Sequence, residues 1–400
     1  MALKKNALYI QSGGPTAVIN ASAYGVIRAC AAHRERIGTL FGARYGMVGL
    51  LKDDLIDLQS LPSDQVELLL QTPSMAFGSC RYRMTDASVD DADYRQALQT
   101  IRKHAIGYLF LNGGNGTLSA ALKLDDFLRR HGEDCKVIVI PKTVDNDIEC
   151  IDHAPGYPST ARHVAITVAE LAHDTRSYNT GLITVAEVMG RNSGWIAAAA
   201  MAAGMGDPAN GPDLIYVPEV PFYTNRFLED VQVVYAQKGR CMAVVAEGVK
   251  DETGKYLFEH SMEDVQNPDL NMGGATPYLT WLLRRHFSCK VRGVDLGLMQ
   301  RCASHSASFV DVAEATRFGE RAVEAALAGV SGMMVSARRV SDAPYRLEET
   351  MVDLLSAAVG GNPLPAKFIA ENGHAVTPAF WDYLAPLVGE LPRHARLDIL

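Results

Sequence analysis

Residues 141–147, Pro-Lys-Thr-Val-Asp-Asn-Asp, combine a cation, a hydroxyl group and two carboxylates directly after an apolar run. Phosphoryl transfer to an alcohol requires positive charge beside the transferred group and a carboxylate that accepts the proton of the hydroxyl group. This one segment offers both, so we interpret it as a candidate catalytic loop. A solvated turn and a calcium-binding loop stay open as interpretations, although the remaining ligands of an EF-hand are missing here.

Two glycine-rich segments have the composition of anion-binding turns. Residues 12–16 read Ser-Gly-Gly-Pro-Thr, residues 112–117 read Asn-Gly-Gly-Asn-Gly-Thr, and each separates an apolar run from an amphipathic stretch. Glycine lets backbone N–H groups approach an anion closely, and the N-terminus of a following helix favours negative charge. One Gly-Gly pair is equally consistent with a plain tight turn, but two such turns in one sheet favour a phosphate or polyphosphate cradle. Neither segment matches the P-loop pattern.

Arginines supply further candidate phosphate ligands. Arg191 lies between glycines in the run Val-Met-Gly-Arg-Asn-Ser-Gly-Trp of residues 188–195. The guanidinium group binds phosphate through two parallel hydrogen bonds and stays charged, which suits a clamp on a transferred phosphoryl group. Arg81, Arg292 and Arg301 are candidates of the same kind. For each of them the alternative is a surface arginine paired with an acidic neighbour.

The hydrophobic pattern predicts the elements that must position these groups. Nearly continuous apolar runs, typical of strands covered by helices on both faces, are found at residues 7–11, 107–111, 136–140, 181–187, 213–217 and 242–246. Amphipathic stretches, typical of helices, are found at residues 17–30, 118–130, 160–173, 224–237 and 310–327. The two kinds of segment alternate along the chain, which indicates parallel strands connected by helices.

The expected fold class is therefore α/β, with two doubly wound, Rossmann-like domains, largely parallel sheets and a C-terminal helical appendage. A chain of 400 residues, 48% of them hydrophobic, is long enough for two or three domains. The last sixty residues have few strand signals, which is why we expect an appendage there. In such sheets ligands bind at the carboxyl ends of strands, where the loop, the turns and Arg191 are all expected.

Composition excludes several classes of function. A formal net charge of −8 without any basic run argues against nucleic acid or an anionic membrane as the main partner. The seven cysteines are scattered and show no C-x-x-C spacing, so they predict neither a zinc site nor disulfides and fit a cytoplasmic protein. No segment has the ~20 uninterrupted apolar residues of a membrane span, and we expect no targeting segment at the N-terminus.

Taken in order, the motifs resemble those of the phosphofructokinase family, from residue 7 to at least residue 339, and they are most similar to its bacterial pyrophosphate-dependent group. Besides the candidate loop, the likeness rests on residues 12–21, 76–81, 155–159, 190–200 and 340–346. The resemblance implies a glycolytic phosphotransferase that forms fructose 1,6-bisphosphate. It further implies that Asp145 accepts the proton of the sugar C1 hydroxyl group, with Lys142, Thr143 and Arg191 as the other catalytic residues.

The same resemblance implies the binding residues. The phosphoryl donor is expected to contact Gly13, Gly14, Arg81, Gly113, Gly114, Asn115, Gly116 and Thr117. Fructose 6-phosphate is expected to contact Thr143, Asp147, Met189, Gly190, Arg191, Glu219, Arg292 and Arg301. Mg²⁺ is the expected cofactor, held mostly by donor oxygens and waters, with Asn115 and Asp147 as the candidates from the protein. The implied domains are a donor domain (residues 1–155 and 301–345), a fructose 6-phosphate domain (156–300) and the appendage (346–400).

Two residues bear on the choice of donor, and they point in different directions. Lys142 stands where the pyrophosphate-using branch has a lysine. Gly116 stands where that branch tends to have an aspartate, whose carboxylate would repel the α-phosphate of ATP, so the glycine permits ATP. The wider likeness favours pyrophosphate, and an ATP-dependent 6-phosphofructokinase is the alternative.

Three departures from the family pattern separate this chain from many of its relatives. Asn115 replaces a metal-associated aspartate, Leu298 replaces a histidine that touches the sugar phosphate, and Leu182 replaces an arginine contributed across a subunit interface. A homodimer or homotetramer is expected all the same. The sequence is also compatible with a different acceptor such as sedoheptulose 7-phosphate and with a non-catalytic regulatory paralogue. A dinucleotide-dependent oxidoreductase fits less well, because its G-x-G-x-x-G fingerprint is missing after the first strand.

Overall fold

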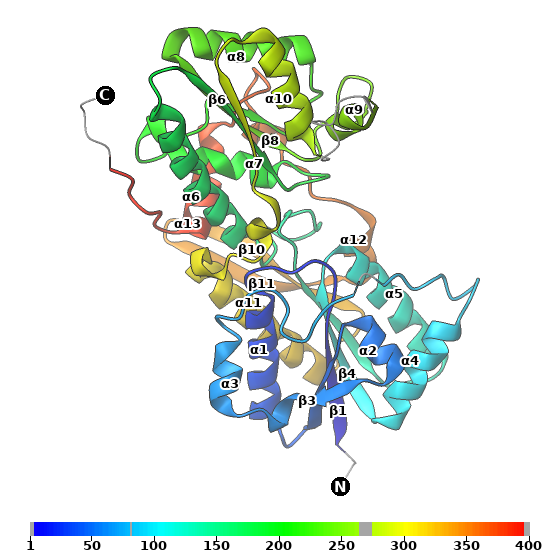
Figure 1. Ribbon diagram of the computed structural model, residues 1–400. Coiled ribbons are helices and arrows are strands. Elements are labelled where there is room, and N and C mark those ends of the chain that lie inside the picture. The colour runs from blue at the N-terminus through cyan, green and yellow to red at the C-terminus, as the bar shows by residue number, and fades with distance from the viewer. Residues whose placement is uncertain (1–3, 81, 264–273, 396–400) are drawn as a thin grey trace. The chain divides into compact units, whose positions relative to one another are not determined.

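The computed structural model describes residues 4–80, 82–263 and 274–395 and contains two compact units. Unit 1 comprises Met1–Ser159 and Arg301–Gly361, and unit 2 comprises Thr160–Gln300 and Asn362–Leu400. Each unit is built around its own sheet (Figure 1). In both, a sheet that is parallel in its centre is combined with helices, so the predicted α/β fold with largely parallel sheets is confirmed.

The sheet of unit 1 has seven strands in the order β11-β10-β5-β4-β1-β2-β3. Their bounds are β1 (Lys5–Gln11), β2 (Ile37–Ala43), β3 (Leu55–Asp57), β4 (Ile106–Gly113), β5 (Lys136–Pro141), β10 (Met333–Asp342) and β11 (Tyr345–Asp353). The five strands β10, β5, β4, β1 and β2 are parallel to one another, whereas the edge strands β11 and β3 are antiparallel to the strands they pair with. The carboxyl ends of β1, β4 and β5 therefore lie on the same edge of the sheet.

Helices cover the sheet of unit 1 on both faces (Figure 1). Their bounds are α1 (Ile19–Ala32), α2 (Met47–Lys52), α3 (Ser63–Leu68), α4 (Ala92–Lys103), α5 (Asn115–Arg130), α11 (Phe309–Leu327) and α12 (Leu354–Val359). Helices α1 and α11 approach each other closely because each has a glycine at the crossing. A Cβ atom on Gly25 would lie 2.0 Å from the carbonyl oxygen of Thr316, and one on Gly319 would lie 2.2 Å from that of Ser22.

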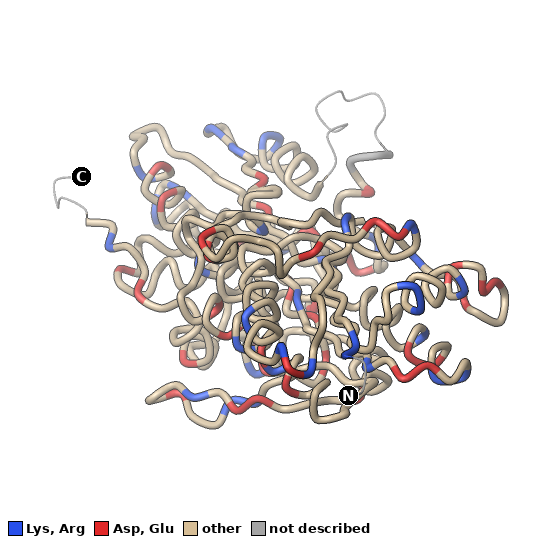
Figure 2. Tube along the Cα trace, turned by 90° about the horizontal axis from the view of Figure 1, so that it is seen from below, with Lys and Arg blue, Asp and Glu red and all other residues tan. Residues whose placement is uncertain are grey.

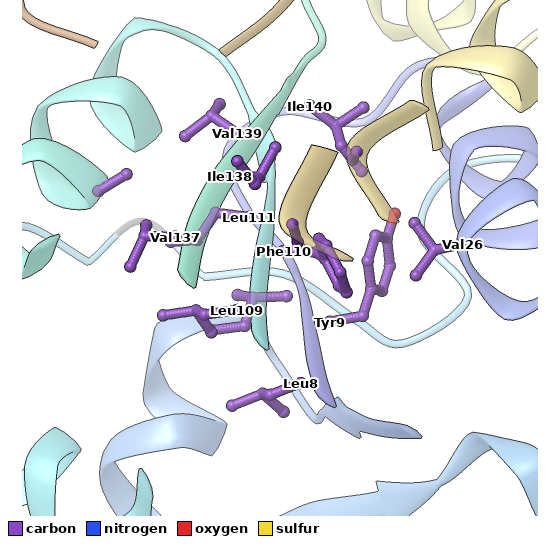
Figure 3. Packing of buried hydrophobic residues seen from close by; sticks show 14 of the residues in the cluster. Leu8, Tyr9, Val26, Leu109, Phe110, Leu111, Val137, Ile138, Val139 and Ile140 are labelled. Atoms are coloured by element: carbon purple, nitrogen blue, oxygen red, sulfur yellow. The ribbon is translucent and has the colours of Figure 1, made fainter. Parts of the chain in front are cut away.

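The core of unit 1 is formed by the central strands, whose side chains are buried on both faces of the sheet (Figure 3). Burial on both faces explains why β1, β4 and β5 read as continuous apolar runs rather than alternating ones. The hydroxyl group of Tyr9 is a polar group within this core, and it accepts a 2.8 Å hydrogen bond from the side-chain amide of Asn112. Asn112 is thus fixed at the carboxyl end of β4, immediately before the second glycine-rich turn.

Unit 2 has a four-stranded parallel sheet in the order β7-β8-β6-β9. The strands are β6 (Leu182–Val188), β7 (Leu214–Tyr216), β8 (Arg240–Ala246) and β9 (Lys290–Asp295). The helices are α6 (Tyr157–Arg176), whose first turn begins in unit 1, and α7 (Trp195–Ala199), α8 (Thr224–Lys238), α9 (Leu257–Glu263), α10 (Ala275–His286) and α13 (Pro378–Val388). Helix α13 provides the predicted C-terminal helix.

Each strand and helix expected from the sequence has a counterpart, but β11 lies at residues where few strand signals were seen. It forms a hairpin with β10, in which Arg338 pairs with Glu348 across the strands at 2.6 Å. Because β11 is an edge strand with many half-exposed side chains, it lacks the apolar run that marks the central strands. The assignment of a donor role and a sugar-phosphate role to particular domains stays a prediction.

The distribution of charge agrees with the composition. Lys and Arg are interspersed with Asp and Glu along the described chain (Figure 2). Within residues 4–80, 82–263 and 274–395, none of the helices combines the length and the hydrophobicity needed to cross a membrane.

Candidate active site

The loop of residues 142–147 follows β5 in unit 1 and is shaped by its own side chains. The hydroxyl group of Thr143 donates to Asp147 Oδ1 at 2.9 Å and accepts from the backbone N–H of Asp145 at 3.1 Å. The backbone N–H of Thr143 donates to the carbonyl oxygen of Pro155 at 3.2 Å. Thr143 therefore fixes the spacing of the two carboxylates and ties the loop to the segment that precedes α6.

Asn146 turns the loop so that its neighbours remain accessible. Its φ angle is 53°, in the left-handed region that asparagine tolerates better than most residues. Its side chain is fully buried, and Oδ1 accepts the backbone N–H of Ala154 at 2.9 Å. Because Asn146 points inward, the carboxylates of Asp145 and Asp147 on either side of it are only partly buried.

Lys142 is a buried cation at the start of this loop, with only 3% of its surface exposed. Its Nζ donates to the carbonyl oxygen of Gly14 at 2.5 Å. Burial lowers the pKa of Lys142 from 10.5 to about 8, against the opposing effect of the Asp145 and Asp147 carboxylates and in the same direction as the nearby Arg301. The ammonium group thus contacts the first glycine turn, and its charge interacts with those of the two carboxylates.

The two glycine-rich turns meet the loop at the carboxyl edge of the sheet. Gly13 has a φ of 81°, and a Cβ atom on it would lie 3.4 Å from Lys142 Nζ. A Cβ atom on Gly14 would lie 3.6 Å from Arg301 Nη1, and one on Gly114 would lie 3.3 Å from the carbonyl oxygen of Lys142. The structure therefore brings together Gly13, Gly14, Gly114, Lys142 and Arg301, which the sequence places up to 288 residues apart.

Helix α5 begins within the second turn. Gly113 packs on Thr117, since a Cβ atom there would lie 2.0 Å from Thr117 Oγ1. Asn115 donates from Nδ2 to Asp147 Oδ2 at 2.9 Å, so its amide orients that carboxylate. Gly116 is exposed, and a Cβ atom on it would meet nothing within 4 Å. The backbone thus leaves open space at the position that bears on the choice of donor.

In unit 2, Met189, Gly190 and Arg191 follow β6. The backbone N–H of Met189 donates to Gln300 Oε1 at 3.0 Å, and Gly190 has a φ of 120° that favours glycine. The guanidinium group of Arg191 lies over the rings of Tyr256 and Phe258, with Cζ 5.6 and 6.0 Å from their centroids. These contacts hold an exposed arginine by cation–π attraction.

Glu219 and Arg292, the other candidates in unit 2, both have partners within the unit. Glu219 Oε1 accepts the backbone N–H groups of Gly194 at 2.8 Å and Leu364 at 2.7 Å, while burial raises the pKa of its carboxyl group. Arg292 pairs with Asp174, donates to the hydroxyl group of Tyr178 at 2.8 Å and lies over its ring. Glu219 thus joins two backbone segments, and a phosphate would compete with Asp174 for Arg292.

Glu247 is a candidate that the sequence reasoning missed. It lies directly after β8, accepts a hydrogen bond from the backbone of Gly190, and has its pKa raised by burial. The next residue, Gly248, packs against the backbone of Arg191, since a Cβ atom there would lie 1.9 Å from the carbonyl oxygen of Arg191. The signal was available, because Glu-Gly follows the apolar run 242–246 just as the other motifs follow theirs.

Two further expectations concern Arg81 and the residues that hold the metal ion. Arg81, expected at the donor, lies outside the described residues. In the part of the chain that the structure describes, no three His, Cys, Asp or Glu side chains gather into a group that could hold a metal ion by themselves.

Comparison with known proteins identifies the family of this chain. The family model described as "Phosphofructokinase" matches residues 6–326. The chain is 38% identical to the pyrophosphate–fructose 6-phosphate 1-phosphotransferase of Methylococcus capsulatus, over 96% of this chain and 91% of that protein. It is 37% identical to the protein of the same name from Halomonas elongata, over 98% and 96%.

A solved structure is similar to this chain over nearly its whole length. The pyrophosphate-dependent phosphofructokinase from Nitrosospira multiformis is 36% identical and superposes with a TM-score of 0.88, over 99% of this chain and 95% of that one. The matches extend through both units, and they include the loop, both glycine turns and the segment around Arg191. The chain belongs to the phosphofructokinase family.

Proposed function

We propose that the protein transfers a phosphoryl group from pyrophosphate to the C1 hydroxyl group of fructose 6-phosphate, which gives fructose 1,6-bisphosphate and phosphate. The observation that carries the proposal is the position of Lys142, a buried ammonium between the Gly13-Gly14 turn and the carboxylates of Asp145 and Asp147. A cation in this position supports phosphoryl transfer, because the reaction needs positive charge beside the transferred group and a proton acceptor near it. The likeness to pyrophosphate-dependent relatives over nearly the whole chain supports the same donor.

In unit 1 the proposed base is Asp145, which takes the proton as the sugar oxygen attacks phosphorus. Lys142 stabilises the negative charge that develops on the transferred group and the leaving phosphate. Arg301, expected from the resemblance to bind fructose 6-phosphate, keeps that role in the proposal. The N–H groups of the two glycine turns, with Thr117 at the start of α5, bind the donor, and helix α5 presents its positive end there. Thr143 holds the base in register through the N–H of Asp145.

In unit 2 the proposed ligands of fructose 6-phosphate are Met189, Gly190, Glu219 and Arg292, and we add Glu247. A carboxylate that accepts sugar hydroxyl groups needs only partial burial and a fixed orientation, and Glu247 has both through the backbone of Gly190. Arg191 is the proposed clamp on the phosphoryl group, since a guanidinium donates two parallel hydrogen bonds to phosphate oxygens.

Mg²⁺ is the proposed cofactor. It commonly binds through one or two carboxylates together with phosphate oxygens and waters, so Asp147 and the donor suffice as ligands. Thr143 and Asn115 each donate to one oxygen of Asp147, which orients the carboxylate and leaves a lone pair on each oxygen. When bound, the ion would neutralise charge on the donor oxygens.

Replacing Gly116 with aspartate should weaken the binding of ATP without weakening the binding of pyrophosphate. A carboxylate at this open position would repel the α-phosphate of ATP, and a repulsion of about 1.4 kcal/mol raises an inhibition constant roughly tenfold. The measurement is competitive inhibition by ATP against pyrophosphate in the wild type and in Gly116→Asp. Gly116→Asn is the matched control of equal size and no charge, and equal inhibition constants in the two variants would refute the electrostatic argument.

The pKa of Lys142 predicts the pH dependence of donor use. Because the pKa is lowered to about 8, the ammonium is charged below that pH and loses its proton as the pH rises through it. We expect kcat/KM for pyrophosphate to fall above about pH 8 in the wild type. The arginine of Lys142→Arg stays charged at all these pH values. The ionisation of pyrophosphate affects both proteins equally, so it cancels when the wild-type kcat/KM is divided by that of Lys142→Arg. This ratio should fall as the pH rises through about 8. A constant ratio from pH 6 to 10 would contradict the assignment.

A direct test of the reaction uses the purified protein with Mg²⁺, pyrophosphate and a panel of acceptors. Fructose 1,6-bisphosphate should be the product from fructose 6-phosphate, with a higher kcat/KM than sedoheptulose 7-phosphate gives. No turnover of any acceptor would support the regulatory paralogue instead. The homodimer or homotetramer and the cytoplasmic location remain predictions, the first to be checked by light scattering of the purified protein.

A further inference from the structure

His153 in unit 1 is buried between two carboxylates, with 2% of its surface exposed. Its Nδ1 lies 2.7 Å from Asp152 Oδ1, and its Nε2 lies 2.7 Å from Glu314 Oε2. A carboxylate accepts but does not donate, so both ring nitrogens must carry protons and the ring is an imidazolium. Burial by itself would lower the pKa of His153, but the two carboxylates raise it from 6.5 to about 9.

Two further side chains complete this arrangement. Arg339 donates from Nη2 to Asp152 Oδ1 at 2.9 Å, and its guanidinium group lies 5.3 Å from the centroid of the Tyr345 ring. Tyr345 donates its hydroxyl to Glu314 Oε1 at 2.7 Å. The five residues Asp152, His153, Glu314, Arg339 and Tyr345, called the His153 cluster below, hold two cations and two anions, with Asp342 paired to Arg339 at the margin.

The His153 cluster links three parts of unit 1 that lie far apart in the sequence. Asp152 and His153 belong to the segment between β5 and α6, Glu314 lies on α11, and Arg339 and Tyr345 lie on the β10–β11 hairpin (Figure 1). None of these side chains is among the ligands or catalytic groups proposed above. His153 is buried and the other four members are only partly buried, so the charges are paired where water screens them weakly. Removal of His153 would take away a cationic partner from both Asp152 and Glu314, and the cluster therefore ties the three segments together.

The connection leads to the 142–147 loop through the backbone next to His153. The N–H of Ala154 donates to Asn146 Oδ1 at 2.9 Å, and the carbonyl oxygen of Pro155 accepts the N–H of Thr143 at 3.2 Å. Residues 154–156 therefore lie along the loop. They follow directly after His153, and the carboxylate of Asp311 holds the same segment from its other end by accepting the N–H of Gly156 at 2.9 Å. From Ala154 the contact passes to Asn146, which separates Asp145 from Asp147.

We propose that the His153 cluster positions the 142–147 loop, so that Asp145 keeps the orientation in which it can accept a proton. Its members are positioning residues, because they act through Asn146 and Thr143 and do not touch substrate. A displacement of a catalytic group by 1 Å can cost about 10²-fold in rate. The effect on turnover rests on the proposed function, whereas the effect on the loop does not.

The test compares His153→Gln with Asp125→Asn by hydrogen exchange and steady-state kinetics. Asp125 is a matched control, since it is equally buried in unit 1 and bonded to Ser331 and Arg129 rather than to the loop. In His153→Gln the amides of Thr143 and Ala154 should exchange at least ~10-fold faster, and kcat should fall roughly 10- to 100-fold with both KM values within about threefold. Asp125→Asn should change neither those amides nor kcat.

Tyr345→Phe is a milder variant that removes only the hydrogen bond to Glu314. The amides of Thr143 and Ala154 should again exchange faster and kcat should again fall, but both changes should be smaller than in His153→Gln. Unchanged exchange of the two amides in His153→Gln, or an equal change in Asp125→Asn, would overturn the proposal. Faster exchange in a protein without pyrophosphate turnover would support the cluster and refute the proposed function, so the two failures are distinguishable.

Discussion

Replacing Asp145 with asparagine should lower kcat by roughly 10²- to 10⁴-fold, because asparagine keeps the shape of the side chain but accepts no proton from the sugar hydroxyl group. The KM for fructose 6-phosphate should change little, since the loss is confined to the transition state. The loop should keep its form, because it is held by the backbone N–H of Asp145 and by Thr143 and Asn146, which the substitution leaves in place. The measurement is the steady-state rate with saturating fructose 6-phosphate and pyrophosphate.

Asp147→Asn is the matched comparison for this prediction. Asp147 accepts hydrogen bonds from Thr143 and Asn115 and is proposed to bind the metal ion. The rate of Asp147→Asn should therefore depend on the concentration of Mg²⁺. Raised Mg²⁺ should restore part of the rate of Asp147→Asn and none of the rate of Asp145→Asn. If Asp145→Asn retained kcat within tenfold of the wild type, Asp145 would not be the base.

Lys142→Met should lower kcat/KM for pyrophosphate by roughly 10²- to 10³-fold, the usual loss when one group that stabilises transition-state charge is removed. Methionine fills nearly the same space without the ammonium group that lies against Gly14. Stability should not fall with activity. Burial lowers the pKa of Lys142, which means that the folded protein disfavours its charged form, so an apolar side chain should be tolerated.

The control for Lys142→Met is Lys136→Met, at the other end of the same strand. Lys136 pairs with Asp134 at 2.9 Å and lies at the end of β5 opposite to the loop. Its replacement should leave kcat/KM for pyrophosphate within about twofold, as expected for an exposed ion pair. Equal kinetic losses in the two variants, or a Lys142→Met protein that simply unfolds, would argue for a structural role of Lys142.

The central strands could be predicted from the sequence because burial on both faces leaves a clear apolar run in β1, β4 and β5. The edge hairpin could not, because half-exposed strands such as β11 alternate weakly and owe their form to pairing with β10. Local turns could also be predicted from the sequence, because their residue types are tied to their backbone conformation. Gly13 and Asn146 occupy left-handed backbone positions that few other residues adopt, so the residue type reflects the conformation.

Contacts between distant segments were the limit of the sequence reasoning for the site. The run 141–147 indicated phosphoryl transfer by itself, but only the structure places Arg301 beside Gly14 and Glu247 beside Gly190. The His153 cluster illustrates the same point, because Glu314 and Arg339 lie over a hundred residues from their partners His153 and Asp152, and no periodicity marks them. Arginine pairs were equally hidden, as with Arg292 and Asp174.

The measurement that tests the central claim most directly is the initial rate with pyrophosphate and with ATP, each at the same concentration, with saturating fructose 6-phosphate and Mg²⁺. The likeness to pyrophosphate-dependent relatives over nearly the whole chain, together with Lys142 at the position of their lysine, predicts a kcat/KM for pyrophosphate that exceeds that for ATP by at least ~100-fold, a difference of about 2.8 kcal/mol. An equal or higher kcat/KM for ATP, together with a rate near zero for pyrophosphate, would contradict the account.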